Sequence, residues 1–348
     1  MKKFVVSTNT SYDILIGKDI MKDAGKLIRK KLEPCRASIV TDMTVNSIYA
    51  QVLVTSLIEA GFQVSKIVFP SGEHSKNLTT YGNILEALAD EGLTRTDVII
   101  ALGGGVVGDL SGFAAATYMR GIKYIQVPTT YIAAIDASVG GKTGINLLSG
   151  KNLAGAFWQP SMVICDYKTF DTLPSEKILD GAAEAIKHGV VSDERLIEKV
   201  LQGDYEYVIE RCVSIKKSIV EADERDLGLR QLLNFGHTIG HGIEKLSSYS
   251  ISHGHAVAKG MVAEARAAEA MDLTPKGVSK ALSDILERAG FDLSIPFSPD
   301  DIYKFALLDK KISGDKISIV APDSIGKCHL HKISVPELKK FIQLGLEP

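Results

Sequence analysis

Four of the eight histidines in this chain fall between residues 237 and 255, with a spacing that could hold a metal ion. The segment LNFGHTIGHGIE places His237 and His241 four residues apart, on one face of a predicted helix. The segment SHGHAVAKGM adds His253 and His255. A lone helical histidine is more often an ordinary core or surface residue, but four together favour a metal site. Spacing alone names His237 and His241 as the ligands.

A third ligand is expected from another segment, because a catalytic zinc usually has three protein ligands and one open position. The segment GAAEAIKHG offers Glu184 within an otherwise apolar helical stripe. A carboxylate buried there needs a partner. Lys187, one turn further on, could pair with Glu184 or contact a substrate.

A glycine-rich turn in DVIIALGGGVVGDLSG suggests a phosphate site. Gly103, Gly105 and Gly108 satisfy the pattern G-x-G-x-x-G where a strand gives way to a helix. Glycines there let backbone N–H groups approach a pyrophosphate at the positive end of the helix. The alternative is a tight turn with close packing between helix and strand. Asp109 follows directly, and a carboxylate beside a phosphate needs a partner or a role.

Two more polar sites follow predicted strands. Asp42 ends the strand ASIVTD, where an acid could bond ribose hydroxyls or cap the next helix. The loop PSGEHSKN carries Glu73 and Lys76, which could equally be solvated. A third segment, PTTYIAAIDASVGGKTGINLLSGKNLAGAFWQP, suits an anionic ligand because its lysines lie on glycine-rich connections. Its polar candidates are Thr129, Thr130, Asp136, Lys142, Lys151 and Asn152.

The elements that must position these groups fall into two halves. Short β-branched runs alternate with helical patterns in the first half, which predicts βαβ units and a mostly parallel sheet. The predicted strands are 37–42, 63–70, 97–105, 124–130 and 162–166, with helices at 45–61 and 78–92. From about residue 175 to 290 the periodicity is helical, and 316–334 is expected to form a β-hairpin. We therefore expect an α/β nucleotide-binding domain (1–174), a mainly α-helical domain (175–348) and a cleft between them.

Composition excludes several classes of protein. The 348 residues are 45% hydrophobic and 24% charged, as in a soluble globular protein. The net charge of -2 argues against general binding to nucleic acid or anionic lipid. No apolar run approaches the roughly 18 residues of a membrane span, and the N-terminus turns polar before a signal core develops. Four scattered cysteines without a C-x-x-C pair favour reduced thiols and the cytoplasm.

Taken together, these segments resemble the 3-dehydroquinate synthase family of the sugar-phosphate cyclase superfamily. The similarity runs in the family's order from about residue 70 to 262, and LLDKKISG echoes it later. The matching segments are PSGEHSK, ALGGGVVGDLSGFAAATYMRGI, VPTTYIAAIDASVGGKTGIN, GKNLAGAFWQP, GAAEAIKHG, DERDLGLRQLLNFGHTIGHGIE and SHGHAVAKGM.

The resemblance implies a set of site residues, and it differs from the bare spacing. It names Glu184, His237 and His253 as ligands of Zn2+ or Co2+, with His241 beside them. The other catalytic residues that it implies are Lys142, Asp136 and Lys187. The implied substrate contacts are Asn152, Lys216, Arg230, Asn234, Lys310 and Lys311. The implied NAD contacts are Asp42, Ser71, Gly72, Glu73, His74, Ser75, Lys76, Gly105, Val106, Val107, Gly108, Asp109, Thr129, Thr130, Lys142, Lys151, Thr169, Phe170, Asp171 and Thr172.

The implied reaction converts 3-deoxy-D-arabino-heptulosonate 7-phosphate to 3-dehydroquinate and phosphate, in the shikimate pathway. It proceeds by transient oxidation with NAD, phosphate elimination, reduction, ring opening and intramolecular aldol closure, so the enzyme is a lyase. The family also implies a homodimer. This chain departs from the family at two positions, since His255 replaces a usual Glu and Thr44 a frequent Asn.

Three alternatives stay open on the sequence. One is another sugar-phosphate cyclase, such as a 2-deoxy-scyllo-inosose synthase. Arg230 and Asn234 favour a substrate that bears a carboxylate, which argues against a 2-deoxy-scyllo-inosose synthase. A second is a metal-dependent polyol dehydrogenase with the same two-domain architecture, which would produce net NADH. A third is a binding protein without activity, which the retained NAD, metal and anion groups disfavour.

Overall fold

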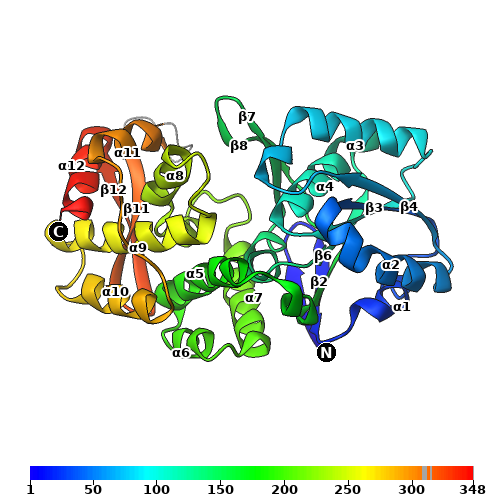
Figure 1. Cartoon of the computed structure of the whole chain (residues 1–348), viewed down its shortest axis with the longest axis horizontal. Helices are drawn as coiled ribbons and strands as arrows, with labels where there is room; N and C mark the ends of the chain where they lie inside the picture. Colours follow the sequence, from blue (N-terminus) through cyan, green and yellow to red (C-terminus); the bar gives the residue numbers. More distant parts are fainter. Residues whose placement is uncertain (308–311, 314–315, 348) are drawn as a thin grey trace. The chain divides into compact units, whose positions relative to one another are not determined.

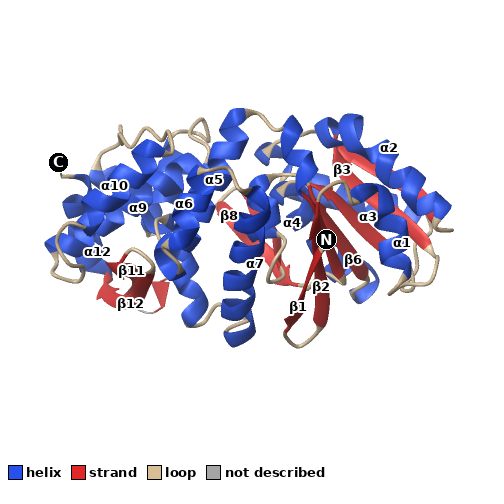
Figure 2. Cartoon of the chain, turned by 90° about the horizontal axis from the view of Figure 1, so that it is seen from below, coloured by secondary structure: helices blue, strands red, loops and turns tan. Residues whose placement is uncertain are grey.

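The structure is a computed structural model that describes residues 1–307, 312–313 and 316–347. The chain divides into two compact units, Met1–Leu173 and Pro174–Pro348 (Figure 1). The large sheet lies in the first unit, whereas helices dominate the second (Figure 2). Within the described ranges, no helix has both the length and the apolar character needed to cross a bilayer.

The first unit is built on a mostly parallel sheet with strand order β1-β2-β9-β6-β5-β3-β4. Its strands are β1 (Lys2–Ser7), β2 (Ser11–Gly17), β3 (Arg36–Asp42), β4 (Gln63–Phe69), β5 (Val98–Gly103), β6 (Lys123–Pro128) and β9 (Met162–Asp166). Only the edge pair β1 and β2 is antiparallel. The α/β class and the five predicted strands are confirmed, whereas the N-terminal hairpin was not predicted.

Both faces of this sheet are covered, which explains why its central strands are apolar without alternation. Ile39 of β3 packs on one face in the same cluster as Leu53 of α2. The next residue, Val40, faces the other way and packs in the same cluster as Leu110 of α4. The helices of this unit are α1 (Ala24–Arg29), α2 (Met43–Glu59), α3 (Leu78–Asp90) and α4 (Gly105–Thr117).

The glycine-rich segment after β6 differs from the sequence expectation. Lys142, Lys151 and Asn152 were expected on connections, but they lie on an antiparallel hairpin of β7 (Lys142–Leu147) and β8 (Gly150–Phe157). The prediction was wrong because glycine was taken as a loop signal. Here Gly144 pairs with Gly155, and a Cβ on Gly155 would lie 2.1 Å from a backbone oxygen of β7. These glycines therefore permit a close approach of two strands.

The second unit is mainly α-helical, as predicted, and its central helix is α9. Alanines on two sides of α9 reach two different core clusters, with Ala258 in one and Ala263 in the other. Small side chains let several helices approach α9 closely. The helices are α5 (Ser175–Ser192), α6 (Arg195–Leu201), α7 (Tyr205–Ala222), α8 (His237–Leu246), α9 (His253–Ala270), α10 (Val278–Arg288), α11 (Pro299–Ala306) and α12 (Val335–Leu346).

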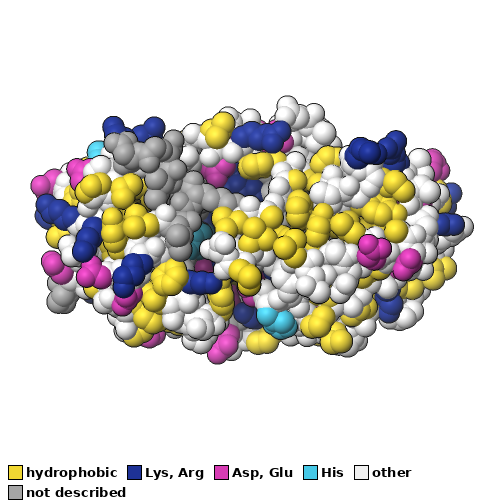
Figure 3. All heavy atoms as spheres, turned by 90° about the horizontal axis from the view of Figure 1, so that it is seen from above, with side chains coloured by type: hydrophobic (Ala, Val, Ile, Leu, Met, Phe, Trp, Pro, Cys, Tyr) yellow, Lys and Arg dark blue, Asp and Glu magenta, His cyan; other side chains and the backbone are white. Residues whose placement is uncertain are grey.

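A small antiparallel sheet completes this unit, with strands β10 (Ile312–Ser313), β11 (Lys316–Ser324) and β12 (Lys327–Ser334). The pairing of β11 with β12 confirms the predicted hairpin. On the face drawn in Figure 3, basic and acidic side chains are interspersed and do not form one large patch of either sign. Such a mixed face agrees with the net charge of -2.

Candidate metal centre and anion-binding loops

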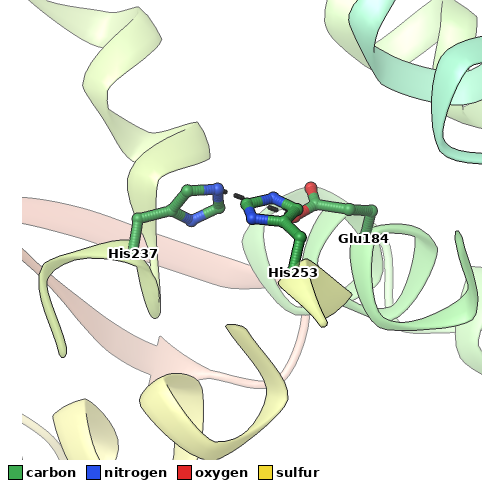
Figure 4. A group of neighbouring side chains, drawn as sticks. All are labelled: Glu184, His237 and His253. Carbon is green, nitrogen blue, oxygen red and sulfur yellow. Dashed lines mark ion pairs between the residues drawn. The ribbon is translucent and has the colours of Figure 1, made fainter. Parts of the chain in front are cut away.

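Three side chains of the second unit meet in the arrangement that the family resemblance implied. Glu184 lies in the middle of α5, His237 is the first residue of α8, and His253 is the first residue of α9. Figure 4 shows the three side chains pointing toward one another. Oε1 of Glu184 lies 3.6 Å from Nε2 of His237 and 3.3 Å from Nε2 of His253. Their ligand atoms all lie within 4.8 Å of one another.

The other nitrogen of each imidazole already has a partner. Nδ1 of His237 lies 3.0 Å from the backbone oxygen of Phe235, and Nδ1 of His253 lies 3.2 Å from Oε2 of Glu244. Both partners are acceptors, so each Nδ1 donates its proton. Nε2 of each ring is therefore the atom that faces Glu184, which is the usual arrangement of histidines that bind metals through Nε2. Glu244 is buried and was missed on the sequence, although it lies in the same quoted stretch.

The charges of the cluster are strongly coupled. Burial raises the pKa of Glu184, but the Lys187 ammonium and a hydrogen bond from His253 outweigh it and hold that pKa well below its usual range. Burial and then the Lys187 charge hold the pKa of His237 well below its usual value. Burial alone would lower the pKa of His253, but the Glu244 and Glu184 carboxylates raise it to about 10. Glu184 is therefore ionised and His237 neutral, as metal ligands must be, whereas His253 is protonated in the metal-free protein and must release its Nε2 proton when a metal binds.

The donor set fits Zn2+ or Co2+. One carboxylate and two imidazole nitrogens make three ligands, which leaves a coordination position for a substrate oxygen. Both carboxylate oxygens of Glu184 are fully buried. They are in ion-pair range of Lys187, His237 and His253. A buried carboxylate in this state is suited to bind a cation.

His241 lies beside this group rather than in it. Its ring centroid is 5.2 Å from that of His237 and 6.2 Å from that of His253. It belongs to a second cluster of possible ligands, with Glu244 and His253. In this second cluster the Glu244 carboxylate is hydrogen-bonded to Nδ1 of His253. The bare spacing had paired His241 with His237, and the clusters within ligand distance do not contain both.

A polar network in the first unit joins three of the segments singled out on the sequence. Nζ of Lys76 lies 2.5 Å from Oδ2 of Asp109 and 2.6 Å from Oδ1 of Asn152. Nδ2 of Asn146 donates to Oε1 of Glu73 over 2.8 Å, and its Oδ1 accepts from the backbone of Asn152 over 3.0 Å. Lys76 and Glu73 thus have partners and are not merely solvated. Asn146 was missed because an amide in a strand carries no distinctive spacing.

Asp42 and the glycine-rich turn both have the structural roles that the sequence analysis gave as alternatives, a helix cap and a closely packed turn. Both also lie at the carboxyl ends of strands, where a ligand can bind. Oδ1 of Asp42 accepts from the backbone nitrogens of Thr44 and Val45 at 2.8 and 3.0 Å, which caps α2. It also accepts from the Ser71 hydroxyl over 2.7 Å, so Ser71, another implied NAD contact, bonds to Asp42 directly. A Cβ on Gly103 would lie 2.5 Å from a methyl group of Val107. Close packing therefore requires that glycine.

The remaining candidates of the first unit follow the carboxyl ends of strands, where α/β folds bind ligands. Gly72, His74 and Ser75 follow β4; Val106, Val107 and Gly108 lie in the first turn of α4, after β5; Thr129 and Thr130 follow β6.

Asp136 lies in the helical turn η4 (Ala133–Ala137), not on a glycine-rich connection as expected. Thr169, Phe170, Asp171 and Thr172 lie in η5 (Tyr167–Thr172). The Tyr49 hydroxyl, not predicted, bonds Oγ1 of Thr172 over 2.6 Å.

The substrate candidates divide between the two units. Lys216 on α7 is buried, and so is Arg230 in the turn η6 (Leu229–Asn234), where one nitrogen donates to the Glu224 carbonyl over 2.7 Å. Asn234 ends the same turn and is half-buried. Lys142, by contrast, is exposed at the start of β7 in the first unit. The candidates Lys310 and Lys311 lie outside the described residues.

Solved structures with the same fold include two sugar-phosphate cyclases. One is 2-deoxy-scyllo-inosose synthase in complex with carbaglucose-6-phosphate, NAD+ and Co2+, with a TM-score of 0.89 and 26% identity over 98% of this chain and 99% of that one. The other is 2-epi-5-epi-valiolone synthase from Streptomyces hygroscopicus subsp. jinggangensis with NAD+ and Zn2+ bound, at a TM-score of 0.87 and 26% identity over 97% and 98%. A glycerol dehydrogenase from Schizosaccharomyces pombe shares the fold at a TM-score of 0.67 and 17% identity, over 96% of this chain and 88% of its own.

Sequence relatives are more specific. A family model for the N-terminal part of 3-dehydroquinate synthase matches residues 66–180, and the model for its C-terminal part matches 181–312. The 3-dehydroquinate synthase of Clostridium acetobutylicum is 42% identical over 96% of this chain and 97% of its own length. That of Streptococcus suis is 41% identical over 99% and 100%. This chain therefore belongs to the 3-dehydroquinate synthase family, and its function is the synthesis of 3-dehydroquinate.

Proposed function

We propose that this chain carries out its reaction with NAD bound by residues 1–174 and with Zn2+ or Co2+ bound by Glu184, His237 and His253. The single observation that carries the proposal is the convergence of these three ligand atoms while both Nδ1 atoms are held by acceptors. Two cyclases with the same fold carry NAD+ together with Co2+ or Zn2+, which supports the same pair of cofactors here.

The metal ligands and their neighbours fix charge and proton positions. A bound divalent metal supplies Lewis-acid polarisation of a substrate oxygen. Glu184 and the two histidines hold it, and Glu244 fixes the tautomer of His253. We propose that His241, one turn along α8 from His237, exchanges a proton with the substrate, because a neutral imidazole can accept or donate near pH 7. Lys187 keeps Glu184 ionised and is close enough to the centre to contact substrate.

We assign dinucleotide binding to the first unit. The bound NAD would supply a reversible hydride acceptor. Gly104 precedes α4 and has no side-chain cap in the described structure, which leaves first-turn N–H groups for a pyrophosphate. We assign the ribose hydroxyls to Asp42, which ends β3. Lys76, in the segment after β4, forms an ion pair with Asp109 of α4. The role of these residues is to bind and orient the dinucleotide.

Cationic and amide side chains would hold the anionic groups of the heptulosonate phosphate. We assign phosphate and carboxylate binding to Lys142, Asn152, Lys216, Arg230 and Asn234, together with the Lys310 and Lys311 pair, and a catalytic role to Asp136. Fixed cations stabilise charge that develops as phosphate leaves. They also hold the flexible substrate in a geometry that suits ring closure.

The two enzymatic alternatives remain instructive. A 2-deoxy-scyllo-inosose synthase shares the fold at 26% identity, whereas the named 3-dehydroquinate synthases reach 42%, so the sequence relatives favour the latter. A polyol dehydrogenase shares the fold alone. Incubating the Zn2+- and NAD-loaded protein with the heptulosonate phosphate decides between them. We expect stoichiometric phosphate release without net NADH. Net NADH would indicate a dehydrogenase, and no phosphate release would contradict the proposed substrate.

We further propose that the protein works in the cytoplasm as a homodimer. The scattered cysteines support a reducing compartment, since Cys165 and Cys212 are buried as free thiols. The family resemblance supports the dimer. Sedimentation equilibrium of the purified protein tests it, and a single species at 37.5 kDa would contradict it.

A further inference from the structure

The two candidate ligand histidines share an unusual position, because each is the first residue of a helix. His237 begins α8 and His253 begins α9. The residues before them, Gly236 and Ser252, cap neither helix through a side chain in the described part of the chain. The first N–H groups of a helix need acceptors from elsewhere when they are buried.

The acceptor for α9 comes from α5, the helix that also carries Glu184. Oδ1 of Asp180 accepts from the backbone nitrogen of Gly254 over 3.0 Å and from the hydroxyl of Ser252. Nδ1 of His255 lies 3.3 Å from the same oxygen. Asp180 is 2% exposed, so these bonds are made away from solvent. Asp180 thereby fixes the first turn of α9 one helical turn from Glu184.

The acceptor for α8 comes in turn from α9. Oε2 of Glu264 accepts from the backbone nitrogen of Gly236 over 2.8 Å, and its Oε1 accepts from that of Ile239 over 3.2 Å. Glu264 is 1% exposed. The three helices that carry the candidate ligands are therefore joined in sequence by two buried carboxylates, α5 to α9 through Asp180 and α9 to α8 through Glu264.

The backbone leaves little room for these helix ends to shift. A Cβ on Gly254 would lie 2.4 Å from the backbone oxygen of Asp180. A Cβ on Gly260 of α9 would lie 2.0 Å from the backbone oxygen of Gly236. Each helix end is thus in direct backbone contact with the helix that caps it, and hydrogen bonds to a carboxylate add strength and direction.

We propose that Asp180 and Glu264 are positioning residues of the metal centre, which hold the ends of α9 and α8 so that Nε2 of His253 and of His237 converge on Glu184. The inference rests on the proposed metal-dependent function. It also gives His255 a role where the family usually has Glu. In this chain the carboxylate is Asp180 on α5, and His255 bonds to it from α9.

The test separates a positioning role from ordinary helix capping. The variants are Asp180→Ala, Asp180→Asn, Glu264→Ala and Glu264→Gln, and the control is Ser298→Ala. Ser298 caps α11 in the same unit through the backbone nitrogen of Asp301, at 3.2 Å, and α11 carries none of the candidate ligands. Zinc affinity is measured by competition with a chelator, and the Tm of the metal-free protein is measured alongside.

We expect the control to lower Tm and leave zinc affinity within twofold of wild type. The two alanine variants should lose at least tenfold in zinc affinity. The Asn and Gln variants keep an acceptor oxygen and should recover part of it. If an alanine variant does not fold, its Asn or Gln counterpart is used instead. A severalfold loss of zinc affinity in that variant supports the positioning role, and no loss contradicts it. Wild-type affinity in folded Asp180 and Glu264 variants would overturn the positioning role. A wild-type protein that binds no zinc would overturn the proposed function itself.

Discussion

Replacing Lys187 with methionine tests how the charges at the metal centre are balanced. Lys187 is 1% exposed and Glu184 0%, and the two form an ion pair one turn apart on α5. Methionine fills much of the same volume without charge. In the metal-free protein, Lys187→Met leaves the Glu184 carboxylate buried with one cation fewer. Stability should fall because a buried charge without its partner is costly.

The structure sets the size of the effect. Removing one partner of a buried ion pair costs about 3–5 kcal/mol. The His253 imidazole lies 3.3 Å from Glu184 and compensates part of its charge, so the lower end, about 3 kcal/mol, is expected. For a unit of this size that corresponds to a fall in Tm of roughly 6–12 °C. The double variant Glu184→Gln, Lys187→Met removes both charges and should cost less than the sum of the single changes.

Zinc provides the internal check, because a metal ion replaces the missing positive charge. At about a thousandfold excess over Kd, binding stabilises a folded protein by roughly 4 kcal/mol. Zinc should therefore restore much of the Tm of Lys187→Met, and it should shift Glu184→Gln far less. Thermal and urea unfolding with and without Zn2+ measure the Tm and the free energy of unfolding of both variants. A cost under about 1 kcal/mol for Lys187→Met, or equal stabilisation of Glu184→Gln and wild type by zinc, would contradict this charge balance.

Three further outcomes are expected. His237→Ala and His253→Ala should each lose stoichiometric zinc, whereas His241→Ala should keep zinc and lose activity; metal analysis showing zinc lost only from His241→Ala would contradict the assignment. Lys142→Ala should fold normally but lose roughly 10–150-fold in kcat/KM, since a charge-assisted contact contributes about 1.5–3 kcal/mol; near wild-type kcat/KM would remove Lys142 from the site. Asp193 is buried, which raises its pKa, but hydrogen bonds from two arginines outweigh burial and lower that pKa. Its stabilisation is present above about pH 4 and lost as the pH falls through the lowered pKa, so Asp193→Asn should lose less stability than wild type between pH 7 and pH 3 in urea unfolding.

Much of the fold could be predicted because its signals are local. Strands β3, β4, β5, β6 and β9 are short apolar runs bounded by turns, and the helices between them have clear periodicity. The N-terminal hairpin was missed because its first strand, β1, is mostly exposed and its apolar run, Phe4 to Val6, is short. The hairpin of β7 and β8 was missed for the opposite reason. Its glycines serve close backbone approach, and a sequence does not reveal which glycine faces another strand.

The site divides in the same way. Glu184 was found because an acid in an apolar stripe needs a partner, and the cluster of histidines was visible in one short stretch. Spacing favoured His241, however, whereas His253 is the histidine that lies within ligand distance of Glu184 and His237. His237 and His241 share a face of α8 because they are four residues apart. Whether His241 or His253 joins Glu184 depends on how α5 and α9 pack. Asp180 and Glu264 were missed because each acts on the backbone of another helix.

The surroundings of the metal centre also solve an electrostatic problem that its position creates. The amino ends of α8 and α9 carry the positive ends of the helix dipoles, which oppose the binding of a cation. Four carboxylates buried in this region reverse the local sign: Asp180, Glu184, Glu244 and Glu264. Asp180 and Glu264 accept from buried N–H groups at the helix ends, which offsets the partial charges at their source. Lys187 balances one negative charge, and a divalent ion bound by Glu184 would balance two more. The same carboxylates that hold the helix ends in place thus make those ends able to hold a metal.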